Sequence, residues 1–181
     1  MTNAAAYLRH ITALGGVPPQ FHQIGGSDPP IITAAFVDSP DEGMTTAFTY
    51  GLSLSEHPNW EQARPELMVC VASLRPEWAT IAGVVAAGMK GNSAFHYGAT
   101  FDAGRPIAPD TAMTAFLLFG PLILDRELAT VRLSGYDVRI TQLYPIYEGE
   151  VKLIHRIGVE KFLGDERLNF VNPARQELLV D

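Results

Sequence analysis

The stretch RPELMVCVASLRPEWATIAGVVAAGM, residues 64–89, decides the fold of this chain. Its first part, Glu66 to Leu74, is a nearly continuous apolar run, which is typical of a central strand covered on both faces. Pro76 then opens a helix at a position where its missing N–H costs nothing. The helix face that we expect to pack on the sheet carries Trp78, Ile81, Val84 or Val85, and Met89.

The remaining chain adds strands and helices around this centre. Strands are expected near 31–37, 44–50, 113–119 and 138–144, with shorter ones near 21–24 and 131–133. Helices are expected near 4–14, 77–89 and 148–157, with a short one at 159–163. Because the strands come in runs with helices inserted, the order predicts a single α+β domain with a central mixed or mainly antiparallel sheet. The predicted core comprises Phe36, Phe48, Val69, Val71, Trp78, Ile81, Phe116, Leu118, Ile140 and Leu143.

Composition restricts the class of protein. The chain has 181 residues, 47% of them hydrophobic and 18% charged, as in a folded domain rather than a disordered one. Its net charge of −7 and scattered basic residues argue against nucleic-acid binding, which depends on clustered Lys and Arg. Neither a signal-peptide pattern nor an apolar run of membrane-spanning length is present in the sequence. The one cysteine, Cys70, lies in the apolar run and is expected to be buried, so we predict a cytoplasmic protein.

The search for catalytic motifs predicts no catalytic residue, no metal site and no cofactor. The five histidines have none of the local spacings of metal motifs, and glycine fingerprints for phosphate are missing from the sequence. One alternative stays open. Two irregular stretches, 51–65 and 91–111, could form a small-molecule or enzyme site between them from His57, His96 and a carboxylate.

Those two stretches are longer than a compact domain needs, and 91–111 is either functional or contains short strands of its own. They carry His57, Trp60, His96, Tyr97 and Phe101 among polar residues. Binding residues concentrate in loops that a rigid sheet supports. The sequence therefore predicts an interface at these loops.

Two residues of this region have alternative interpretations. Glu66, at the entrance of the central strand, either forms a structural ion pair with Arg64 or caps backbone N–H groups, or else faces a partner. Trp60 either anchors its loop or serves as an interface aromatic. Elsewhere, Glu148 and Glu150 begin a helix, where the helix dipole explains acidic residues.

The order of several segments is similar to that of the Suppressor of fused family. Tyr50-Gly51-Leu52-Ser53 closes a strand, and Arg64-Pro65-Glu66-Leu67-Met68-Val69 begins the next one, followed by the helix that carries Trp78. The segment Leu143-Tyr144-Pro145-Ile146-Tyr147-Glu148-Gly149-Glu150 leads directly into another helix. The resemblance is to the compact, stand-alone bacterial form. It divides the chain into an N-terminal helix and linker (1–25), the family domain (26–173) and a C-terminal tail (174–181).

The resemblance implies a role in protein binding, and bacterial members of the family are associated with immunity to toxins. We therefore predict a non-enzymatic domain that binds a protein partner, with a toxin that it occludes as one form of that partner. The expected contact residues are His57, Trp60, Glu61, Glu66 and Tyr97. For a basic partner, Glu56 and Glu61 at the rim would speed association. The oligomeric state is left open.

Overall fold

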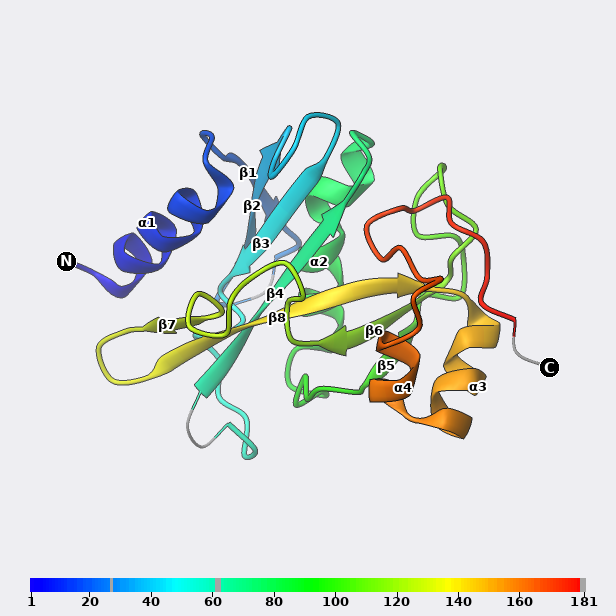
Figure 1. The fold of residues 1–181 in the computed structure, drawn as a ribbon. Helices are drawn as coiled ribbons and strands as arrows, with labels where there is room; N and C mark the ends of the chain where they lie inside the picture. The colour runs from blue at the N-terminus through cyan, green and yellow to red at the C-terminus, as the bar shows by residue number, and fades with distance from the viewer. Residues whose placement is uncertain (27, 61–62, 180–181) are drawn as a thin grey trace.

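Strands of the chain form one mixed sheet, with helices on both of its faces (Figure 1). The computed structural model describes residues 1–26, 28–60 and 63–179. Within these residues the strand order is β1-β2-β3-β4-β8-β6-β5, and β7 also pairs with β8. The elements are α1 (Asn3–Gly15), β1 (Gln20–Ile24), β2 (Ile31–Val37), β3 (Thr45–Tyr50), β4 (Ala63–Val71), α2 (Pro76–Met89), β5 (Thr100–Asp102), β6 (Ala115–Phe119), β7 (Thr130–Arg132), β8 (Asp137–Ile146), α3 (Glu148–Ile157) and α4 (Val159–Leu163).

The centre of the sheet is the pair β4 and β8, which run parallel from Ala63 opposite Asp137 to Met68 opposite Gln142. The other strand pairs of the described residues are antiparallel. The predicted α+β class and its mixed, mainly antiparallel sheet are therefore confirmed. Strand β4 begins and ends three residues earlier than the expected 66–74, and Leu74 beyond it is exposed.

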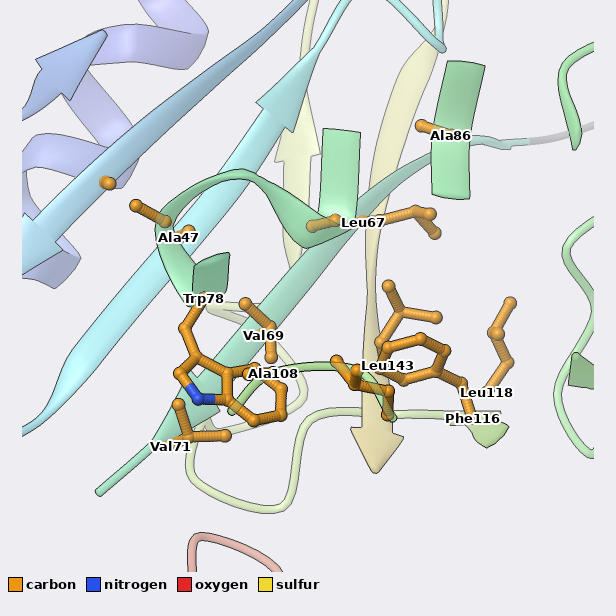
Figure 2. Close-up of a cluster of buried hydrophobic side chains, with 14 of the residues drawn as sticks. Ala47, Leu67, Val69, Val71, Trp78, Ala86, Ala108, Phe116, Leu118 and Leu143 are labelled. Atoms are coloured by element: carbon orange, nitrogen blue, oxygen red, sulfur yellow. The ribbon is translucent and has the colours of Figure 1, made fainter. Parts of the chain in front are cut away.

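Side chains that alternate along β4 serve two different cores, as the period of two in a strand requires. Leu67, Val69 and Val71 point toward α2, and Figure 2 shows Val69 and Val71 beside the ring of Trp78. Met68 and Cys70 point to the opposite face, which α1 covers. Cys70 is buried there, as expected from its apolar surroundings. Nine of the ten predicted core residues are buried, and the exception is Ile81.

Helix α2 packs on the sheet through the predicted Trp78 and through small residues, while the predicted Ile81, Val85 and Met89 are only partly buried against the same core. Ala79, Ala82, Gly83 and Ala86 are buried with Trp78, whereas Val84 is half exposed and Ile81 is only half-buried. A Cβ at Gly83 would lie 2.6 Å from side-chain atoms of both Ile24 and Thr33. At Gly83 the helix therefore approaches the sheet too closely for a larger residue, and Ile81 and Val84 lie at its flanks.

A third core lies under α3 and α4 at the far end of β6 and β8. Its buried members include Tyr144, Phe162 and Leu178. The last segment of the described chain thus packs on the sheet through Leu178. The stretch 91–111, for which short strands were one of two expectations, contains β5, which pairs with β6. The predicted boundaries at residues 25 and 173 stay predictions.

Candidate functional site

The candidate site is a groove on the α2 face of the sheet, beyond the area that the helix covers. Helix α2 packs on β1 to β4, so loops cover the adjoining part of this face instead. The floor consists of Ala63 and Pro65 from β4 and Arg139 and Thr141 from β8. Pro65 and Arg139 are direct neighbours in the parallel pair. Because alternate residues of a strand share a face, Arg139 and Thr141 lie on the same side as the core residue Leu143.

Two loops that are distant in sequence form the walls of this hollow, which we call the Trp60 groove. One wall is Asn59 and Trp60, from the β3–β4 loop, and the other is the segment 94–97 that follows α2. The indole N–H of Trp60 donates a hydrogen bond to the carbonyl oxygen of Ala94 at 3.0 Å, which ties the walls together. The groove encloses about 380 Å³. In Figure 1 the two loops, cyan and green, lie next to each other below the sheet.

Two aromatic side chains at this groove, those of Trp60 and Tyr97, are partly exposed to solvent. Trp60 is half-buried, and its ring lies 5.4 Å from that of His57 on the outer side of the loop. Tyr97 is 42% exposed and its ring lies 5.1 Å from that of Phe119. Amphipathic aromatic side chains of this kind supply large contact areas in interfaces.

Tyr97 and Arg139 also line a second hollow, which we call the Arg126 groove. It encloses about 400 Å³ and lies between Tyr97 and the segment that joins β6 to β7. Arg126 comes from that segment. Burial raises the pKa of the Tyr97 hydroxyl, and the nearby positive charges of Arg139 and Arg126 oppose that rise. The two grooves are therefore neighbours that share one wall.

The charge of the lining differs from that of the chain as a whole. Acidic residues outnumber basic ones by 20 to 13 in the sequence. The described residues that line the two grooves nevertheless include Arg126 and Arg139 and no Asp or Glu. Of the acidic rim expected from the sequence, Glu56 is exposed on the outer side of the Trp60 loop beside His57. Glu61 lies outside the described residues.

Glu66 is fully buried, so the prediction that it contacts a partner is wrong. Its carboxylate accepts hydrogen bonds from the hydroxyls of Thr49 and Ser53 and from the backbone N–H groups of Gly51 and Ser53, at 2.6 to 2.9 Å. The alternative of a backbone-capping carboxylate is the correct one. Arg64 does not pair with it, but donates to the carbonyl oxygens of Ser53 and Ser55. Glu66 thereby fixes the first half of the loop whose second half carries Trp60.

This anchored loop begins at a residue that only glycine suits. Gly51 has a φ of +118°, and a Cβ there would collide with the backbone carbonyl of Pro30. The turn brings the N–H groups of Gly51 and Ser53 to the same carboxylate oxygen. Backbone geometry and the buried carboxylate together hold the start of the loop.

Burial raises the pKa of Glu66 above its ordinary value of 4.5, and the four hydrogen bonds oppose that rise. The folded chain therefore keeps this proton to a higher pH than the unfolded chain does. A contribution of this sign is fully present below the unfolded pKa and is lost as the pH rises through the folded one. We expect Glu66→Gln to gain stability relative to the wild type as the pH rises from about 4 to about 7. Urea unfolding of both proteins across this range measures it, and a difference that does not change with pH contradicts it.

The structure brings together three of the five predicted contact residues. His57, Trp60 and Tyr97 lie around the Trp60 groove, and His96 lines it. Phe101 lies apart, on β5, beside α2. The sequence analysis did not identify Arg139. Its position could have indicated it, because Arg139 is a charged residue between the apolar residues Val138 and Ile140 of a predicted strand.

Sequence reasoning also missed the role of Glu150, which is fully buried and paired with Arg175. The carboxylate accepts a hydrogen bond from the backbone N–H of Tyr147, in a capping box. The signal that could have found it is the spacing of three residues between the helix N-cap and an acidic side chain. This pair lies under the C-terminal segment, away from the groove.

The lining of the grooves suits binding better than acid–base chemistry. Among the described lining residues the groups that can exchange protons are His96 and Tyr97, with no carboxylate or thiol beside them. Within the described residues no three His, Cys, Asp or Glu side chains lie close enough to hold a metal ion. Among the residues that the structure describes, no helix has both the length and the apolar character needed to cross a bilayer.

Comparison with known proteins places the chain beside one family. The sequence profile described as Suppressor of fused protein (SUFU) matches residues 27–176. A SUFU homologue from Neisseria gonorrhoeae FA 1090 has a similar structure, with a TM-score of 0.77 and 15% identity, over 99% of this chain and 98% of its own. A search by sequence among curated proteins found no match.

Two further solved structures share the fold. A chain of the Sufu–Fu complex matches with a TM-score of 0.71 and 14% identity, over 97% of this chain and 91% of its own. Drosophila Suppressor of Fused matches with a TM-score of 0.65 and 11% identity, over 96% of this chain and 50% of its own.

Proposed function

The chain belongs to the Suppressor of fused family, and on this premise we propose that it is a non-enzymatic, cytoplasmic domain that binds a protein partner in the Trp60 groove. A solved relative in complex with Fu supports protein binding as the general role. The location of the interface rests on this chain's own structure.

One observation carries the proposal: two loops, tied together by the hydrogen bond from Trp60 to Ala94, present aromatic side chains around an open groove. Trp60 and Tyr97 are partly exposed, although burying them would be favourable. Interfaces concentrate their binding energy in a few aromatic and arginine residues inside a polar rim. His57, Asn59 and Thr141 supply polar groups around them.

The test is recovery of a partner from the source cell with the immobilised chain. We expect one protein to bind the wild type and to bind Trp60→Ala and Tyr97→Ala at least about tenfold more weakly, because truncated interface aromatics cost that much or more. The dissociation constant of the purified partner, measured by calorimetry, gives the size of the effect.

The matched control is Phe21→Ala. Phe21 is 57% exposed but lies on β1, the edge strand that β2 and β3 separate from the β4–β8 pair at the groove. The control variant should bind the partner as the wild type does. If Trp60→Ala and Tyr97→Ala fold normally and also bind like the wild type, the groove is not the interface.

For the identity of the partner we propose a toxin that the domain neutralises by occluding it. The family resemblance and the lack of a charged catalytic pair in the described lining support this form of the proposal. Co-expression tests it: the wild type should restore growth to cells that make the recovered partner, and Trp60→Ala should not. A partner that is harmless to cells removes the toxin assignment and leaves the protein-binding proposal intact.

A second candidate function is binding of a small molecule between the same loops. The volumes of the two grooves, about 380 and about 400 Å³, lie in the range of ligand pockets. Turnover or binding of a metabolite by the purified chain, abolished by His96→Ala, would replace the protein-binding proposal.

A further inference from the structure

We propose that the segment of the partner that enters the two grooves is acidic, with apolar or aromatic side chains among its carboxylates. This inference rests on the proposed function, and it names the chemistry of the partner at the same site. It reverses the expectation drawn from the net charge, which favours a basic partner.

The charged residues that line the two grooves are arginines. Arg139 stands on the floor of the Trp60 groove and also lines the Arg126 groove, while Arg126 belongs to the second alone. Both arginines are exposed, and neither forms an ion pair with an acidic residue of the described chain. Arginine binds carboxylates with two parallel hydrogen bonds, so two arginines along adjoining grooves suit a segment with spaced carboxylates.

Aromatic and exposed apolar side chains lie beside these arginines. Tyr97 separates them, and Trp60 walls the first. In the segment beside the Arg126 groove, Leu122, Ile123 and Leu128 are each more than 40% exposed. Apolar side chains of a bound segment can pack on these residues while its carboxylates meet the arginines.

The net negative charge of the chain disfavours a nucleic acid as the partner. A chain of net charge −7 repels a long polyanion such as a nucleic acid, whose binding requires many phosphate contacts. A short acidic segment needs only the arginines of the lining: Asp125 and Glu127 flank Arg126 and are exposed, but neither lines the groove. The observations therefore favour an acidic peptide over a nucleic acid.

The test uses three labelled peptides of twelve residues, read by fluorescence anisotropy with the full chain. The first alternates Glu and Asp with Leu and Phe, the second replaces every carboxylate by its amide, and the third replaces them by Lys. A twelve-nucleotide poly-dT strand is the fourth probe. We expect the acidic peptide to bind at least about tenfold more tightly than the amide peptide, with an affinity that falls as salt rises.

Arginine variants test whether the acidic peptide binds at the two grooves. The double variant Arg126→Gln/Arg139→Gln should weaken the acidic peptide at least about tenfold, whereas Arg9→Gln, which removes an exposed arginine from α1, should change it less than about twofold. Equal binding of the acidic and amide peptides, no binding of the acidic one, tighter binding of the Lys peptide or of poly-dT, or an equal effect of Arg9→Gln overturns the inference.

The same variants separate this inference from the proposed function. If the recovered partner is lost with Trp60→Ala but kept with Arg126→Gln/Arg139→Gln, the groove binds a protein whose segment is not acidic. If the partner is kept with all of these variants, the proposed interface itself is wrong.

Discussion

Replacing Trp78 by alanine is expected to lower the free energy of unfolding by about 3–5 kcal/mol. The indole is fully buried between α2 and the sheet, where Figure 2 shows it beside Val69, Val71 and Ala108. Its N–H also donates to the carboxylate of Asp110 at 3.1 Å. The variant therefore leaves a large cavity and removes a hydrogen bond to a charged group. Since a domain of ordinary stability has only about 5–15 kcal/mol to lose, the effect should be plain in urea unfolding.

The control for this prediction is Ile81→Ala in the same helix. Ile81 is half-buried, so its truncation removes less buried surface and leaves no closed cavity. It should cost clearly less than Trp78→Ala. A loss below about 1 kcal/mol for Trp78→Ala would mean that the helix is not held to the sheet in this way.

Replacing Arg175 by methionine should be about as damaging, at about 3–5 kcal/mol, because it leaves a buried carboxylate without its counter-charge. Arg175 is only 6% exposed, and both of its terminal nitrogens donate to the Glu150 carboxylate, at 2.5 and 2.6 Å. In the variant, the donors that the described residues still offer to Glu150 are the N–H groups of Tyr147 and Leu178. Urea unfolding measures the loss.

Two further variants show whether the loss comes from the unpaired charge. Glu150→Gln/Arg175→Met removes both charges and should be more stable than Arg175→Met alone. Arg167→Met removes the arginine of an exposed pair with Asp165 and should leave the unfolding midpoint nearly unchanged. If Arg175→Met and the double variant are equally unstable, lost packing rather than an unpaired charge explains the effect.

The central strand and its helix could be predicted because the signals are local. An apolar run of strand length and a helix opened by Pro76 lie next to each other in the sequence. Ile81 packs against the core as predicted but is only half-buried, for a reason that is not local. The distance between helix and sheet depends on Gly83 meeting Ile24 and Thr33, which come from strands far away in the chain.

The candidate site could be predicted in part. Trp60 and Tyr97 were selected from the sequence because they are aromatic residues in long loops, and the structure places both at the groove, while their role in binding stays a prediction. Glu66 can be buried because a turn at Gly51 brings hydrogen-bond donors to its carboxylate. This contact joins a turn to a strand that comes later in the chain, and the hydrophobic pattern of the sequence does not indicate it. Arg139 becomes part of a groove only because α2 packs on β1 to β4 and leaves this part of the sheet to loops.

The most direct measurement of the groove assignment is amide hydrogen exchange of the chain, alone and with its purified partner bound. We predict slowed exchange in the two walls of the Trp60 groove, at Asn59, Trp60 and residues 94–97, and little change along the edge strand β1. Protection along β1 with unchanged exchange in both walls would contradict it.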